Sequence, residues 1–119
     1  PCLPRRDRKA EVKIKDGVSL AGLVPQMVLA AVIVRDAYAA RDPLCSCTIT
    51  SANDGTHGVD SLHSRDGLCR ALDFRTHDYH GDVEKLGQDI RGALGADFDV
   101  VIEDLNHANE HIHVEWDPA

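Results

Sequence analysis

The spacing of hydrophobic and polar residues predicts five short β-strands. Residues 11–15 alternate apolar and polar side chains in steps of two, and this segment ends at the turn signal Asp16-Gly17. Residues 46–51 are rich in β-branched side chains, which favour strands. Residues 69–74 have a similar mixture, and the chain closes with an apolar segment over 98–102 and an alternating one over 110–116. We therefore expect strands at these five places.

Two longer segments have the character of helices. Residues 26–40 follow Pro25, are rich in Ala, Leu and Val, and are apolar nearly all round, which predicts a buried helix that ends before Pro43. Residues 81–94 place apolar side chains on a single stripe, which predicts an amphipathic helix closed by Gly95. The stripe consists of Val83, Leu86, Ile90 and Leu94.

The order of these elements predicts the fold class. Two helices are too few to cover both faces of a doubly wound sheet, so we expect an α+β fold in which a mainly antiparallel sheet packs with two main helices. A chain of 119 residues forms one domain, with 1–10 as an N-terminal arm. Residues 52–68 are polar and glycine-containing, and a loop of this length in a small domain is usually functional or mobile.

Charge and hydropathy exclude several classes of partner. Thirteen Lys and Arg face twenty Asp and Glu, giving a formal charge of −7, which argues against nucleic acid or an anionic membrane as the main partner. The longest apolar run covers residues 27–34, whereas a membrane span needs about 20 residues. The basic N-terminal segment has no apolar region after it, so we expect no signal peptide in this sequence and an unknown export route. We expect a monomer.

Four cysteines leave three interpretations open. They are Cys2, Cys45, Cys47 and Cys69, and no Cys-x-x-Cys pair occurs among them. A cysteine-rich zinc site is therefore disfavoured. The cysteines are either free and buried, or joined in one or two disulfides whose connectivity the sequence cannot give, or, least favoured, bound to a metal.

Seven histidines in a domain with five aromatic residues direct attention to metal and acid–base chemistry. One group of candidate ligands lies in Ser61-Leu62-His63 and Arg70-Ala71-Leu72-Asp73, and the other lies in residues 110–116. A catalytic zinc ion takes three ligands from His, Asp or Glu and keeps one position open for water. His63, Asp73 and His113 can supply the ligands, and Glu110 can act as the base that accepts the proton of the water.

Strand geometry sets a condition on this interpretation. In a regular strand His111 and His113 share a face, while Ile112, Val114 and Trp116 form the apolar face. Glu110 then points away from the metal unless the chain turns or bulges where the strand begins, and the loop-like residues 106–109 allow such a turn. His111 is expected beside the metal, where it orients another group or polarises the oxyanion of the transition state.

These motifs resemble those of the zinc D-alanyl-D-alanine carboxypeptidases and L-alanyl-D-glutamate endopeptidases. This superfamily includes vancomycin-resistance D,D-peptidases, phage endolysins and the zinc fold of Hedgehog signalling domains. Its pattern is Ser-x-His, then Gly-x-Ala-x-Asp, then Glu- or Asp-x-x-His near the C-terminus, and the similarity covers roughly residues 46–116. The resemblance implies a Hedgehog/DD-peptidase-like fold, zinc bound by His63, Asp73 and His113, Glu110 as the base, and a peptidoglycan stem peptide as the substrate.

Two departures from the family pattern affect the expected site. Nine residues separate His63 from Asp73, where the family has six, so Asp66 competes with Asp73 as a ligand, and Asp73 is preferred because residues 71–74 keep the local pattern. Many members also carry an Arg soon after the Thr-Ser strand that binds a substrate carboxylate, and this chain has Asn53-Asp54 there. Arg70 or Arg75 is expected to take that role, since a guanidinium suits a carboxylate. This change favours an endopeptidase.

His57 and Ser61 complete the expected substrate-binding residues. Both lie in the long loop, where Ser61 alternatively braces the backbone and His57 alternatively is solvated. A serine nucleophile is disfavoured because the chain has no Gly-x-Ser-x-Gly motif.

The sequence thus predicts a zinc metallopeptidase that hydrolyses an amide bond in peptidoglycan stem peptides, such as L-Ala–D-Glu or D-Ala–D-Ala, and acts at the cell wall. Two alternatives remain. One is a non-catalytic, zinc-stabilised module that binds the wall or a protein, and the other is a secreted, disulfide-stabilised domain without metal.

Overall fold

The computed structural model describes residues 10–52 and 67–118 and contains two helices and five strands in that part of the chain. The elements follow one another as β1 (Val12–Ile14), α1 (Pro25–Arg41), β2 (Cys47–Ser51), β3 (Ala71–Arg75), α2 (Val83–Leu94), β4 (Phe98–Glu103) and β5 (His111–Trp116). This order confirms the expected succession of strands and helices and the α+β class.

The five strands form one sheet in the order β1-β2-β3-β5-β4. The pairs β2–β3, β3–β5 and β4–β5 are antiparallel, but β1 pairs with β2 in parallel, so the sheet is mixed and the prediction of a mainly antiparallel sheet is corrected. The reason is the connection between the first two strands. Because α1 separates β1 from β2, the chain is carried back along the sheet before β2 begins, as in a βαβ unit.

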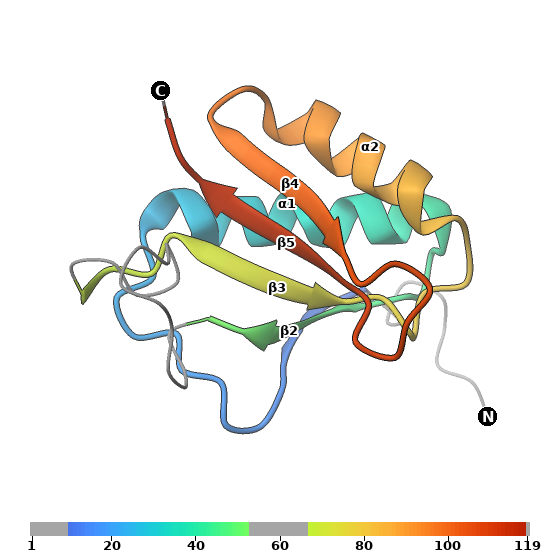
Figure 1. Cartoon of the computed structure of the whole chain (residues 1–119), viewed down its shortest axis with the longest axis horizontal. Helices are drawn as coiled ribbons and strands as arrows, with labels where there is room; N and C mark the ends of the chain where they lie inside the picture. Colours follow the sequence, from blue (N-terminus) through green and yellow to red (C-terminus); the bar gives the residue numbers. More distant parts are fainter. Residues whose placement is uncertain (1–9, 53–66, 119) are drawn as a thin grey trace.

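Both helices pack on one face of the sheet, and α1 runs behind the strands in Figure 1. Alternate residues of the central strands point to this face and are fully buried, among them Leu72, Phe74, Ile112 and Val114. They form a single core with Met27, Val34, Leu86 and Ile90 of the helices. The opposite face of the same strands is thereby left for polar side chains.

Helix α1 is buried on one side only, which corrects the expectation of an all-round buried helix. Met27, Val34 and Tyr38 are covered, but Val28 is 50% and Leu29 67% exposed. A helix with one layer beneath it buries only the stripe that faces that layer, whatever the hydropathy of the other side.

Helix α2 confirms the predicted amphipathic helix. Leu86 and Ile90 are buried against the sheet, and Gly95 ends the helix with a φ of 85°. Its first turn is capped by Asp82, whose carboxylate accepts hydrogen bonds from the backbone N–H groups of Glu84 and Lys85.

Cys45, Cys47 and Cys69 are buried free thiols, which is the first of the three interpretations drawn from the sequence; Cys2 lies outside the described residues. Neither helix found in residues 10–52 and 67–118 is both long and apolar enough to span a membrane.

Candidate metal and catalytic site

The polar face of the sheet collects charged side chains from three adjacent strands. In the β3–β5 pair, Asp73 stands opposite His113 and Arg75 stands opposite His111. In the β4–β5 pair, Glu103 stands opposite His111. Opposed residues in a sheet point to the same face, so the alternation that buries Phe74 and Ile112 brings these five side chains together on the other side.

The prediction that His111 and His113 share a face, with Ile112 and Val114 on the apolar one, is confirmed.

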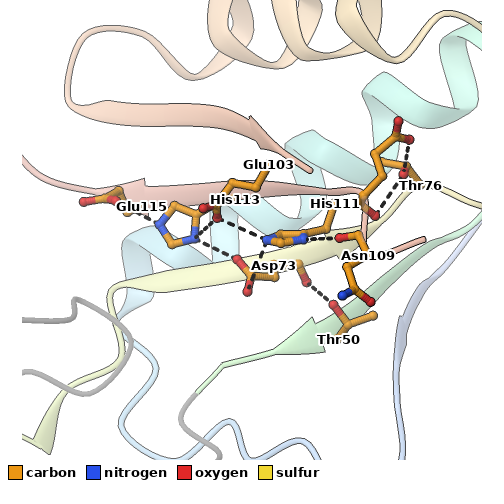
Figure 2. Close-up of polar contacts among 9 residues, drawn as sticks. Thr50, Asp73, Thr76, Glu103, Asn109, His111, His113 and Glu115 are labelled. Carbon is orange, nitrogen blue, oxygen red and sulfur yellow. Dashed lines mark hydrogen bonds and ion pairs between the residues drawn. The ribbon is translucent and has the colours of Figure 1, made fainter. Parts of the chain in front are cut away.

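Asp73 and His113 form the closest contact between two predicted ligands. Asp73 Oδ1 lies 2.7 Å from His113 Nδ1, and the other ring nitrogen of His113 lies 2.8 Å from Glu115 Oε1 (Figure 2). Burial disfavours the charged imidazolium, but the hydrogen bonds and charges of Asp73 and Glu115 outweigh it and raise the pKa of His113 to about 9. Without a metal, His113 is therefore a cation held between two carboxylates near neutral pH.

His111 is positioned by its own set of contacts. Its Nδ1 lies 2.7 Å from the Asn109 carbonyl oxygen, and its Nε2 lies 3.1 Å from Glu103 Oε1 and 3.9 Å from Asp73 Oδ2 (Figure 2). Burial lowers the pKa of His111, and these acceptors raise it by more, so the net shift is upward. The Asn109 carbonyl is the acceptor for an Nδ1–H, and the carboxylates of Glu103 and Asp73 that face Nε2 favour a second proton on that nitrogen.

Glu103 is a member of this cluster that the sequence does not predict. It ends β4, eight residues before His111, and its Oε1 also lies 3.8 Å from His113 Nδ1. No local motif links Glu103 to the histidines, because their proximity depends on the register between β4 and β5. The acidic surplus of the sequence is the only signal that could have pointed to it.

Glu110 lies at the turn that leads into β5. The turn is closed by a hydrogen bond from the Glu110 N–H to the His107 carbonyl. The chain therefore turns immediately before β5, which is the condition that the sequence set for Glu110 to approach the metal. The buried Thr76 hydroxyl donates to Glu110 Oε1 at 2.5 Å, and the Asn106 N–H donates to Oε2 at 2.8 Å. Glu110 and Asp73 line one cavity of about 390 Å³, together with Lys15, Thr50, Arg75, His77, Ala108, Asn109 and His111.

The donor atoms fit a divalent cation. Two atoms that each bind zinc at about 2 Å lie no more than about 4 Å apart. Asp73 Oδ1 and His113 Nδ1 satisfy this limit at 2.7 Å, as do His111 Nε2 and Asp73 Oδ2 at 3.9 Å. Asp73, Glu103 and His111 also present ligand atoms within 4.8 Å of one another. Histidine with carboxylate is a donor set that zinc accepts.

The remaining predicted residues divide into three groups. His63, the third expected ligand, and His57, Ser61 and the competing Asp66 lie outside the described residues. Arg75 lines the cavity of the site, and its role in substrate binding stays a prediction. Arg70 precedes β3, where its carbonyl accepts from the Trp116 N–H, and it is not among the described residues that line this cavity.

Comparison with known proteins gives no relative for this chain. No protein-family model matches it, and neither the curated proteins nor the solved structures include a match.

Proposed function

We propose that this protein is a zinc-dependent peptidase that hydrolyses an amide bond in peptidoglycan stem peptides at the cell wall. The observation that carries the proposal is the cross-strand contact between Asp73 and His113 at 2.7 Å, and Asp73 also lines a cavity together with Glu110. Two distant segments of the sequence thus supply a carboxylate and an imidazole at ligand spacing, and a second carboxylate lies nearby without being bound to them.

Asp73 and His113 would hold the zinc, with His63 as the third ligand. Zinc bound in this way lowers the pKa of water toward about 7 and polarises the carbonyl of the bond to be cut. Glu115 and Glu103 fix the orientation of the imidazoles through their hydrogen bonds, as outer carboxylates commonly do for metal-bound histidines.

Glu110 supplies the proton transfer. Its carboxylate accepts a proton from the attacking water, whose oxygen becomes part of the new carboxyl group. When the C–N bond breaks, the Glu110 carboxyl group returns that proton to the departing amine. Thr76 holds Oε1 while this occurs, and a protonated His111 donates a hydrogen bond to the oxyanion from Nε2.

Paired variants separate catalysis from metal binding. Glu110→Gln is expected to keep zinc and lose lysis of purified cell walls, whereas His113→Ala is expected to lose both. Glu84→Gln, an exposed change in α2, is the control and is expected to behave as wild type. Zinc content by elemental analysis and turbidity of a wall suspension give the two readouts. Full lytic activity in Glu110→Gln would contradict the assignment of the base.

One observation favours a second candidate, a non-catalytic zinc module that binds wall peptide. Both oxygens of Glu110 are engaged, by Thr76 and by Asn106, which is also what a carboxylate needs if it only shapes the turn before β5. Under this candidate, the zinc-loaded protein sediments with purified walls and releases no fragments from them. Release of fragments by wild type and not by Glu110→Gln decides for the peptidase.

A further inference from the structure

A second cavity lies beside the site described above, on the same polar face of the sheet. Its volume is about 620 Å³, and Arg75 belongs both to its wall and to the wall of the cavity that contains Asp73. Thr48 of β2 and Lys13 of β1 line the second cavity and not the first. The reaction proposed above makes no use of this second cavity.

Thr48 is a buried polar residue whose hydroxyl has no hydrogen-bond partner in the described part of the chain. Cys47 and Ile49 belong to the core, so the alternation along β2 turns the Thr48 side chain to the opposite face, toward the cavity. The residue is only 8% exposed. A buried hydroxyl without a partner costs folding free energy, and an acceptor on a ligand in the cavity would offset this cost.

Two cations flank Thr48 from the neighbouring strands. Lys13 of β1 is its register partner. On the other side, β2 and β3 are antiparallel, with Ile49 paired to Phe74. The residue before the one and the residue after the other are neighbours, which places Arg75 beside Thr48. A cation, a hydroxyl and a second cation therefore follow one another across three strands that are spaced about 4.8 Å apart.

Neither cation is neutralised by a close ion pair. Lys13 is exposed and forms no ion pair within residues 10–52 and 67–118. The Arg75 guanidinium has a long contact of 3.8 Å with Asp78 Oδ2. An anionic group placed above the Thr48 hydroxyl would therefore be attracted by both cations and would accept a hydrogen bond from the hydroxyl.

The directions of these donors suit a tetrahedral oxyanion. A group above Thr48 meets the hydroxyl from below and the side chains of Lys13 and Arg75 from opposite sides. A phosphoryl group presents oxygens in several directions and can accept from all three donors. A carboxylate presents two oxygens in one plane, so it leaves at least one of these donors poorly aligned.

The rest of the cavity wall limits the charge of the ligand. Three carboxylates, from Asp16, Asp42 and Asp78, also line it, and they equal in number the three cations of Lys13, Lys15 and Arg75. A second anionic group would be repelled by these carboxylates. Ile14 and Leu44, which are 48% and 43% exposed, provide apolar surface in the same wall. The portion of the ligand beyond its phosphoryl group is therefore expected to be uncharged.

We propose that this cavity binds an alkyl phosphate, a phosphoryl group esterified to an uncharged alcohol. Thr48, Lys13 and Arg75 hold the phosphoryl group, and the alcohol portion lies against Ile14 and Leu44. The site is one of binding only, and the inference does not depend on the proposed peptidase. The ligand has two sources that share this chemistry, a free phosphate monoester and a phosphodiester within a polymer.

Isothermal titration calorimetry tests the ligand class. The probes are glycerol 3-phosphate, the phosphodiester of two glycerol molecules, glycerate, inorganic phosphate and pyrophosphate. At least one of the two glycerol phosphates is expected to bind wild type about tenfold more tightly than glycerate. Tighter binding of the monoester points to the free source, and tighter binding of the diester points to the polymer. Pyrophosphate is expected to bind no more tightly than inorganic phosphate.

Variants of Thr48 and Lys13 test the location of the site. Thr48→Val and Lys13→Gln are each expected to weaken binding of the tighter glycerol phosphate about tenfold, whereas Thr48→Ser keeps the hydroxyl and is expected to bind like wild type. Thr48→Val is also expected to unfold at no lower urea concentration than wild type, because its hydroxyl has no partner to lose. Lys85→Gln, the same charge change on the exposed face of α2, is the control and is expected to bind like wild type.

The titrations are made with the zinc-loaded protein and repeated after zinc is removed. Equal binding in both forms supports a site that is independent of the metal, and loss of binding without zinc overturns the inference. It is also overturned if neither glycerol phosphate binds more tightly than glycerate, if pyrophosphate binds more tightly than inorganic phosphate, or if Thr48→Val and Lys13→Gln bind like wild type.

Discussion

Asp73 on β3 and His113 on β5 are directly opposed in the sheet, and Asp73 Oδ1 lies 2.7 Å from His113 Nδ1. The two residues are forty positions apart in the sequence, with α2 and β4 between them, so their contact is made by the pairing of β3 with β5. The same register places Arg75 opposite His111, which brings the acidic, basic and imidazole side chains of the site onto one short stretch of sheet.

The elevated pKa of His113 predicts how the stability of the metal-free protein depends on pH. The folded-state pKa of about 9 exceeds the ordinary value of 6.5, so the ion pairs stabilise the fold fully below pH 6.5 and this contribution is lost as the pH rises through 9. The loss amounts to at most about 3 kcal/mol. Urea unfolding at pH 6 and pH 9.5 measures it, with His113→Gln as the variant that lacks it. An equal decline in both proteins would contradict the assignment.

The same protonation predicts that zinc binding depends on pH. Zinc needs the neutral imidazole, so it must displace the proton that Asp73 and Glu115 stabilise. Between pH 7 and pH 8.5 the affinity for zinc is expected to rise about tenfold per pH unit. Competition with a chromogenic chelator at several pH values measures this slope, and an affinity that is constant over the range would refute His113 as a ligand.

Thr76 is expected to position Glu110. The Thr76 side chain is buried at 2% exposure, and its hydroxyl donates to Glu110 Oε1 at 2.5 Å. Thr76→Val removes this donor with little change of shape, so we expect a tenfold or larger loss of kcat, unchanged zinc content and a stability loss of about 1–2 kcal/mol. Thr76→Ser keeps the hydroxyl and is expected to restore kcat. Unaltered kcat and pH profile in Thr76→Val would show that Glu110 acts without this support.

Two glycines are expected to respond to alanine with opposite signs. Gly22 has a φ of +74°, and a Cβ atom on it would clash with the Gly67 carbonyl oxygen, next to the hydrogen bond from the Cys69 N–H to the Gly22 carbonyl. Gly22→Ala is therefore expected to cost more than about 2 kcal/mol. Gly92 lies in α2 with open space around it, so Gly92→Ala is expected to stabilise the protein by about 0.5–1 kcal/mol. Denaturant unfolding measures both, and a harmless Gly22→Ala would contradict the close approach.

Local periodicity was sufficient to predict part of this structure. The alternation in residues 111–116 correctly separates His111 and His113 from Ile112 and Val114, because a strand with one buried face imposes that pattern on its own sequence. The apolar stripe through Leu86 and Ile90 and the glycine that follows identify α2 for the same reason. A helix with one buried face imposes that spacing on its own sequence.

Features that depend on the relation between elements could not be predicted in this way. The parallel direction of β1 follows from the path of the chain through α1, and the place of Glu103 beside His111 follows from the β4–β5 register. Exposure of Leu29 depends on whether a second layer covers α1, which hydropathy does not encode. Lys15 shares the cavity of Asp73 only because β1 lies next to β2 at the edge of the sheet.

The most direct test of the central claim is mass spectrometry of purified peptidoglycan after incubation with the zinc-loaded protein, with and without a chelator. The account predicts either fragments with newly exposed D-Glu amino termini or released D-Ala, and these products disappear with the chelator and return when zinc is restored. Intact stem peptides after incubation with the zinc-loaded protein, or the same fragments in the presence of the chelator, would contradict it.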